Sequence, residues 1–361
     1  MRKVLLTLFL FLSSGFIYSQ GWILGPFIKT RVNPVISADS SFKFFDPLKK
    51  KIVAWQKADV FNPAAVVRKN KVYLLTRCED NPKATLGGRT SRIGLCYSKD
   101  GIHFKKHPEP VLYPGDDGFK EFDYPGGCED PRVVETEDGT YVMTYTSWNY
   151  KVARLSIAFS DDLFHWQKKG PAFARAYDGR FLNNWTKSAS IITEMKNNRL
   201  VASKINGKYW MYWGEGFINL AWSDNFIDWY PLLDENGNLK KLISPRPGKF
   251  DSSLTECGPP ALKTDKGILL IYNGRNANNQ DFDPDLPKGT YSVGQVLFSL
   301  TDPEKVIART DTCILKPTLP HEMTGQYSSG TTFSEGLVFF KGKWFLYYGT
   351  ADSFVGLAVK E

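Results

Sequence analysis

The feature that most constrains the fold is a repeated pattern of two short strands. Each copy has a turn, then an aromatic strand, then a second strand. In three copies the second strand ends at a serine, and an aspartate and then a Phe or Trp follow within a few residues. The copies begin at Lys71, Gly139, Gly207, Lys266 and Gly342. Their spacing is roughly 60 to 75 residues, which is longer than a minimal propeller blade needs. The surplus falls in loops, which we expect at residues 76–92 and 273–291.

This pattern predicts an all-β chain. Short aromatic and β-branched runs bounded by Gly, Asn, Asp and Pro are typical of strands. After the first twenty residues, no apolar stretch keeps a helical period. Five small antiparallel sheets arranged radially form a five-bladed β-propeller. Dividing the chain would cut the series, so we predict one domain over residues 21–361. The inner strands of such a fold bring distant residues to one central pocket.

The N-terminus has the order of a secretory signal. Arg2 and Lys3 precede the apolar run 4–11, then small residues, then Ser19 and Gln20. The run is too short to span a membrane. No cysteine lies near its end, so a lipid anchor is not indicated. We therefore predict that residues 1–20 are a signal peptide and that the protein is exported, most simply to the periplasm.

Composition argues against several classes of partner. The formal charge of +8 is diffuse, and its only run, Lys49 to Lys51, is typical of a solvated face, so no nucleic-acid partner is expected. The five cysteines include no Cys-x-x-Cys, and the four histidines have no ligand spacing, so we predict no metal site. No Gly-rich phosphate loop precedes a helix, which argues against a nucleotide cofactor. We predict no cofactor of any kind.

The segment Gly127 to Arg132 is the first candidate for chemistry. It presents two adjacent carboxylates, Glu129 and Asp130, after a Pro-Gly-Gly turn. Pro131 restricts the backbone before it, so the acids are held in place. By itself such a segment is more often a salt-bridged turn. Its position among the repeats favours a functional role.

Several segments together resemble a known family. They are residues 61–64, 73–77, 91–95, 98–101, 127–132, 186–189, 204–209, 258–260 and 347–352. In order and spacing they are similar to glycoside hydrolase family 130, most of whose members are β-mannoside phosphorylases with a five-bladed propeller. The similarity covers nearly the whole chain after residue 20.

The resemblance implies roles for individual residues. It places the proton donor on Asp130, which in the family passes its proton through a hydroxyl of the substrate. Four more positions match contacts to the sugar in the cleavage subsite: Asn62, Arg77, Arg92 and Asp352. Each of these could also be structural when taken alone. Lys187 is kept from the family pattern and could bind an anion.

Two of the usual sources of positive charge in the phosphorylases are missing from this chain. Phosphate needs basic groups of fixed geometry. The residue four positions before Gly258 is Leu254 instead of a cation, and Trp213-Gly214 replaces a His-Arg pair. Glu215 and Glu256 stand beside these losses.

Two acids in a low-dielectric pocket would repel phosphate and could activate water as a general base. That is the inverting glycosidase arrangement. A hydrolytic branch of the family, acting on β-1,2-mannosides, shows a similar exchange. We therefore predict an inverting, exo-acting β-mannosidase for β-1,2 linkages of mannan-type oligosaccharides. Glu215 and Glu256 stay equal candidates for the base, and the oligomeric state stays open.

Three other functions remain as hypotheses. A phosphorylase could build its anion site on Lys187 and release mannose 1-phosphate. A non-catalytic glycan-binding propeller would use the aromatic residues, which are 14% of the chain. A furanosidase-type five-bladed propeller, such as an arabinanase, would carry three carboxylates on separate blades. The segments of this chain that resemble family 130 do not match that class. The loop 275–289 is expected at the rim of the pocket, where it could set chain-length preference.

Overall fold

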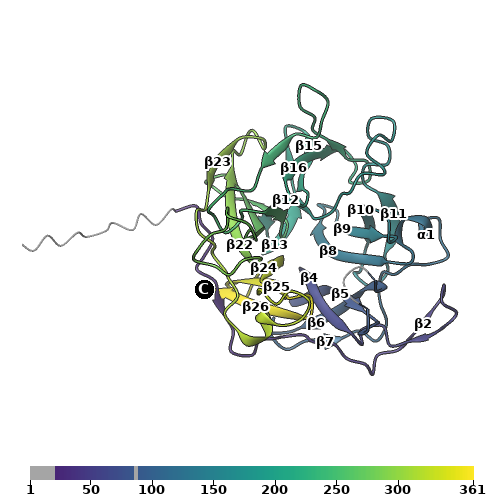
Figure 1. The fold of residues 1–361 in the computed structure, drawn as a ribbon. Helices are drawn as coiled ribbons and strands as arrows, with labels where there is room; N and C mark the ends of the chain where they lie inside the picture. Colours follow the sequence, from purple (N-terminus) through teal and green to yellow (C-terminus); the bar gives the residue numbers. More distant parts are fainter. Residues whose placement is uncertain (1–20, 85–87) are drawn as a thin grey trace, which may run out of the picture.

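The computed structural model describes residues 21–84 and 88–361, and nearly all its regular structure is β-strand (Figure 1). The predicted signal peptide lies outside the described residues. Helical structure within them is limited to α1 (Lys120–Asp123) and the 3₁₀ turn η1 (Pro320–Met323). Over the same ranges, neither element has the length or the apolar character of a membrane-crossing helix.

All five predicted strand pairs are confirmed as antiparallel pairs. They are β5 (Lys71–Glu79) with β6 (Ser91–Ser98), β9 (Tyr141–Trp148) with β10 (Ala153–Ser160), β15 (Lys208–Trp213) with β16 (Ile218–Ser223), β21 (Ile268–Arg275) with β22 (Tyr291–Phe298), and β25 (Lys343–Thr350) with β26 (Phe354–Lys360). The loops expected at 76–92 and 273–291 are shorter than predicted, because β5 continues to Glu79 and β21 continues to Arg275.

Each pair gains an inner partner. These inner strands are β4 (Asp59–Arg68), β8 (Gly127–Glu135), β12 (Ala189–Lys196), the successive strands β19 (Leu254–Cys257) and β20 (Ala261–Lys263), and β24 (Phe333–Phe340). Figure 1 shows the resulting groups arranged around the middle of the molecule. Short parallel bridges join neighbouring groups, such as Ser91 with Gly127 and Ile192 with Ala261.

Outer strands complete the groups. They are β1 (Ile28–Lys29), β7 (Lys105–Lys106), β11 (Gln167–Pro171), β17 (Tyr230–Pro231), β18 (Lys241–Ile243) and β23 (Val306–Arg309). The short strands β13 (Arg199–Ala202) and β14 (Lys204–Ile205) extend the third group. A separate hairpin, β2 (Phe44–Asp46) with β3 (Lys51–Val53), projects from the first group in Figure 1.

The apolar core lies between adjacent groups. Leu74 of β5 packs in one buried cluster with Phe345 and Tyr347 of β25. Met211 of β15 shares another with Val142 of β9. Burying such side chains supplies most of the stabilisation, at about 25 cal/mol per Å² of apolar surface. The inner strands contribute to the core as well, since Val134 of β8 and Ile191 of β12 belong to the cluster of Met211.

Candidate active site

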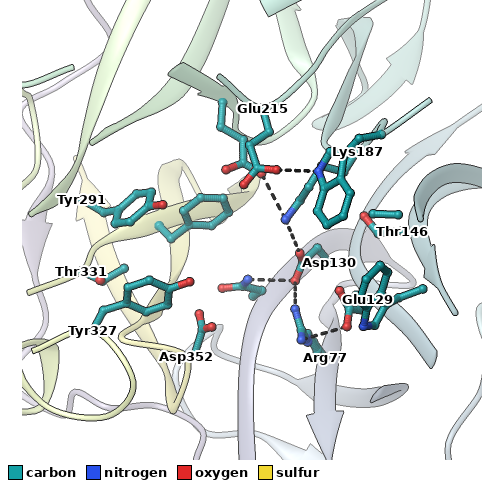
Figure 2. A pocket seen from close by; sticks show the side chains of 16 residues that line it. Arg77, Glu129, Asp130, Thr146, Lys187, Glu215, Tyr291, Tyr327, Thr331 and Asp352 are labelled. Atoms are coloured by element: carbon teal, nitrogen blue, oxygen red, sulfur yellow. Dashed lines mark hydrogen bonds and ion pairs between the residues drawn. The ribbon is translucent and has the colours of Figure 1, made fainter. Parts of the chain in front are cut away.

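A cavity of about 290 Å³ lies where the inner strands meet, and residues from all five strand groups line it (Figure 2). Its lining comprises Asn62, Arg77, Glu129, Asp130, Thr146, Trp148, Ala153, Trp185, Lys187, Glu215, Glu256, Tyr291, Tyr327, Thr331, Phe333 and Asp352. Eight of the nine candidate residues singled out from the sequence, Glu129 included, are in this set. The fold therefore brings together side chains as far apart in sequence as Asn62 and Asp352.

Arg92 is the exception. Its side chain is completely buried, and it is not among the described residues that line the cavity. Its guanidinium pairs with Asp46 at 2.5 Å and with Asp80 at 3.1 Å. The contact with Asp46 fastens β6 to the projecting hairpin, and Asp80 directly follows β5. The predicted contact between Arg92 and the sugar is not supported by this placement.

No residue of the loop 275–289 is among the described residues that line this cavity, so the expectation that the loop rims the pocket stays a prediction. The side chain of Asn276 folds the loop back on itself, because its Nδ2 donates to the carbonyl oxygens of Asp283 (3.1 Å) and Leu286 (3.0 Å). Tyr291, the first residue of β22, reaches the cavity instead.

Backbone irregularities aim Asp130 and Asn62 at each other. Both residues have a φ of +46°, and the strand register shifts at both places. Such bulges re-aim side chains and are common beside functional sites. Asn62 Nδ2 donates to Asp130 Oδ1 at 2.9 Å. Gly349 permits this approach, since a Cβ there would lie 1.9 Å from Asn62 Oδ1.

Arg77 binds both acids of the Gly127 to Arg132 segment. Its Nη1 lies 3.2 Å from Asp130 Oδ1, and its Nη2 lies 2.9 Å from Glu129 Oε1 (Figure 2). Burial favours the neutral form of Asp130, but Arg77, Lys187 and Arg132 together hold its pKa well below the usual range. Burial raises the pKa of Glu129 to about 7, against the opposing charge of Arg77. With these neighbours Asp130 is ionised at neutral pH, whereas Glu129 is protonated in a fraction of the molecules.

Glu215 and Glu256 form a second acidic pair. An isolated antiparallel β-bridge joins Glu215, in the segment after β15, to Glu256 on β19. The Oγ of Ser188 donates to Glu256 Oε1, and the indole N–H of Trp185 donates to Glu215 Oε2 at 2.9 Å. Burial raises the pKa of Glu256 to about 7. Lys187 opposes this shift and the charge of Glu215 adds to it.

Lys187 lies between the two acidic pairs. Its Nζ is 3.5 Å from Asp130 Oδ2 and 3.6 Å from Glu256 Oε1. Burial would lower its pKa, but Glu215, Glu256 and Asp130 hold the pKa well above its usual value. The ammonium is therefore charged, and its charge is already matched by carboxylates.

Carboxyl groups outnumber cations in the cavity lining by five to two. The fifth carboxyl, Asp352, has a pKa raised to about 7, mainly by burial, with Arg77 opposing and Asp130 adding to the shift. Such a lining disfavours a multiply charged anion. It suits proton transfer, which needs carboxyl groups of contrasting pKa in one site.

The sequence did not single out the other half of the lining. Figure 2 shows Tyr291, Thr331 and Tyr327 on the side of the cavity away from Lys187 and Thr146. The remaining members of this half are Thr146, Trp148, Ala153, Trp185 and Phe333. Aromatic residues are too frequent in this chain for these to stand out. Only Trp185 had a local signal, because it directly precedes the Thr186-Lys187 segment of the family pattern.

A cavity that pairs carboxyl groups of contrasting pKa is typical of glycoside-cleaving enzymes. The model of glycoside hydrolase family 130, described as beta-1,4-mannooligosaccharide phosphorylase, matches residues 28–361. The chain belongs to this family, and it is an enzyme of the β-mannoside-acting group.

Two solved structures are similar to nearly the whole chain. One comes from work on family 130 glycoside hydrolases that target β-1,2 mannosidic linkages in Candida mannan; it is 49% identical, with a TM-score of 0.92, and the match covers 94% of this chain and 95% of that one. Another, a candidate glycosidase from Bacteroides thetaiotaomicron VPI-5482, is 53% identical, with a TM-score of 0.91 and coverage of 92% and 96%. A 1,2-beta-oligomannan phosphorylase from Thermoanaerobacter sp. (strain X514) is more distant, at 34% identity over 85% of this chain and 91% of its own length.

Proposed function

We propose that this protein is an inverting, exo-acting β-mannosidase that hydrolyses β-1,2 linkages of mannan-type oligosaccharides, with water as the nucleophile. In this proposal the five strand groups are the blades of a five-bladed propeller, and the cavity is its central pocket. The observation that carries the proposal is the excess of carboxylates over cations around Lys187. The greater similarity to family hydrolases than to the phosphorylase supports it.

The proposed roles follow from the geometry. Asp130 supplies the proton, through a hydroxyl of the bound mannoside, to the oxygen that leaves C1. Glu215 and Glu256 hold a water molecule on the opposite face, and one of them takes its proton as the oxygen bonds to C1. Since Asp130 is ionised beside its cations, it must gain a proton with the substrate, and Glu129 is the neighbour that still holds one near pH 7.

Asn62, Arg77 and Asp352 are proposed to orient the sugar. The side chain of Asn62 is held by the bond from its Nδ2 to Asp130, and all three residues line the cavity. Polar groups of fixed geometry provide orientation and leave bond cleavage to the acids.

Product analysis tests the proposal directly. β-1,2-, β-1,3- and β-1,4-mannobiose would each be incubated with and without phosphate, and the anomer formed first would be followed by NMR. We expect mannose from the β-1,2 substrate, initially as the α-anomer, at a rate independent of phosphate. Strictly phosphate-dependent release of mannose 1-phosphate would favour the phosphorylase hypothesis, in which Lys187 would bind the phosphate. Binding without turnover would favour a glycan-binding module.

We also propose that the protein is exported. The support is the basic, apolar, small-residue order of residues 1–20. Phosphorolysis conserves the energy of the glycosidic bond in a sugar phosphate, which is useful only inside the cytoplasm. A hydrolase makes no sugar phosphate, so it forfeits no such advantage when it acts outside the cytoplasm. Fractionation of the native host, with immunodetection and N-terminal sequencing of the mature chain, would test this; an uncleaved cytoplasmic protein would contradict it.

Replacing Glu129 by Gln should shift the pH dependence of kcat/KM. Glu129 and Asp130 share Arg77, and a charge on one raises the pKa of the other. Without the Glu129 charge, the pKa of Asp130 falls further, so less of it is protonated at any given pH. We expect the alkaline limb to move to lower pH and activity at neutral pH to fall about tenfold. Glu137→Gln, at an exposed ion pair with Lys196, is the control. An unmoved limb, or one moved to higher pH, would contradict the prediction.

Replacing Trp185 by Phe should lower kcat about tenfold, because the ring is kept but the N–H that fixes Glu215 is lost. KM should change little, since Trp185 is 56% exposed at the cavity and Phe preserves most of its contact surface. Trp222→Phe is a matched control, because Trp222 stacks on Tyr230 away from the cavity lining. A variant with unchanged kcat would show that Glu215 needs no such support.

A further inference from the structure

The buried guanidinium of Arg132 joins the backbone at the proposed acid to the backbone beside the proposed base. Its Nη1 donates to the carbonyl of Asp130 at 3.0 Å. Its Nη2 donates to the carbonyl of Cys257 at 2.9 Å, and its Nε donates to that of Gly258 at 3.3 Å. Cys257 and Gly258 directly follow Glu256. One rigid side chain therefore spans two strand groups at the positions that carry opposite halves of the reaction.

The carboxyl group that faces Arg132 is that of Glu335 on β24, and burial holds its pKa well above the usual range against the charge of Arg132. Arg132 Nη2 lies 3.0 Å from Glu335 Oε1, with both side chains at or below 2% exposure. Neither carboxylate oxygen of Glu335 has another hydrogen-bond partner among the described residues. A buried contact of this kind between a carboxyl group and a guanidinium contributes little net stability, because desolvation offsets the attraction. Because the two side chains contact each other just outside the cavity lining, we expect their role to be to fix the position of the backbone around the cavity.

The bond to Asp130 O also concerns a strained backbone. Asp130 has a φ of +46°, a conformation that is strained for a residue other than Gly. The side chain of Arg132 reaches back two residues to hold the carbonyl of that conformation. The planar fork of a guanidinium can bind three carbonyls and a carboxylate in fixed directions, whereas a lysine ammonium cannot.

We propose that Arg132 is a positioning residue that sets the separation between the carboxyl groups of Asp130 and Glu256, and that Glu335 holds Arg132 in place. The inference rests on the proposed acid and base roles. Inverting glycosidases need their carboxyls roughly 6.5–9.5 Å apart, to leave room for water. A shift of about 1 Å in a catalytic group can lower the rate about 100-fold.

The test compares two substrates with different demands on the acid. β-1,2-Mannobiose needs protonation of its leaving oxygen, whereas 2,4-dinitrophenyl β-mannoside does not. We expect Arg132→Lys to lower kcat on mannobiose about 100-fold, with KM within about threefold of the wild-type value. The loss of kcat on the aryl substrate should be smaller by a factor of at least about ten. Glu335→Gln should show the same split with a smaller loss, about tenfold on mannobiose, and it serves if Arg132→Lys folds poorly.

Arg309→Lys is the matched control, because Arg309 also joins a carboxylate, Asp251, to a carbonyl, that of Ser244, outside the cavity lining. It should retain the wild-type activity on both substrates per folded molecule. Equal losses on the two substrates in Arg132→Lys and Glu335→Gln, or kcat within threefold of wild type in both, would overturn the proposal. If the wild type proves to need phosphate, the proposed function fails, but the leaving-group comparison still reports whether Arg132 places the acid.

Discussion

Replacing Asp130 by Asn should reduce kcat/KM for β-1,2-mannobiose about 10³-fold, with the protein still folded. Asn has nearly the same shape, so it can stay beside Asn62 and Arg77, but it cannot supply a proton to the sugar. General acid catalysis typically contributes about 10²–10⁴-fold. The loss should appear mainly in kcat, because the groups that bind the sugar are unchanged.

The experiment needs a control on the same strand. Glu135 ends β8, is buried, and pairs with Arg199 outside the cavity lining. Glu135→Gln should keep nearly full activity per folded molecule. For Asp130→Asn, kcat on 2,4-dinitrophenyl β-mannoside should fall much less than kcat on mannobiose. If Asp130→Asn retained activity on mannobiose within tenfold of wild type, the proton donor would have to be another group, and Glu129 would be the first to test.

The sequence predicted the outer strand pairs well and the inner strands poorly. In β5 or β25 the aromatic and β-branched residues are continuous enough to mark a strand. In β8 the residues Gly127 to Arg132 include a proline and three charged side chains, which normally argue against a buried strand. The bulge at Asp130 accommodates the proline. The local rule fails at the place where the chain is adapted for chemistry.

The site residues show a similar division. Glu215 and Glu256 stood out because they lie beside positions where the family pattern has cations, and the structure places them side by side. Arg92 also matched the pattern, but whether a side chain on β6 faces the cavity or the projecting hairpin depends on packing that no motif encodes. For the same reason Tyr291 and Tyr327 could not be told from the many aromatic residues of the core.

Lys187 matches the family pattern, but the groups around it in this chain differ from those expected at the anion site of a phosphorylase. In a cavity rich in cations, an ammonium here would add to an anion site. In this chain it lies 3.5–3.6 Å from carboxylate oxygens of both acidic pairs. Its charge instead lowers the pKa of Asp130 and that of Glu256, and so keeps both closer to the ionised state. The same lysine is thereby suited to acid–base chemistry with water.

Replacing Glu256 by Gln should lower kcat about 10³-fold, and Glu215→Gln should lower it at least 100-fold, because the two carboxylates share one water. The double variant should lose little more than Glu256→Gln alone, since groups acting as a unit are not additive. The wild-type rate should rise with pH through about 7, where Glu256 becomes ionised, and this acidic limb should disappear in Glu256→Gln. Glu194→Gln, at a half-buried ion pair with Lys196 outside the cavity lining, is the control.

Sodium azide gives the decisive readout for these variants. Azide needs no general base, and loss of one negative charge should admit this anion to the cavity. With 2,4-dinitrophenyl β-mannoside, azide should restore part of the rate in Glu256→Gln and yield α-mannosyl azide, the product of attack on the face opposite the leaving group. Attack by azide on C1 forms the C–N bond as the C–O bond to dinitrophenolate breaks, so no proton is required. A β-configured azide product would place Glu256 on the wrong face and contradict its role as base, whereas restoration in Glu215→Gln alone would assign the base to Glu215.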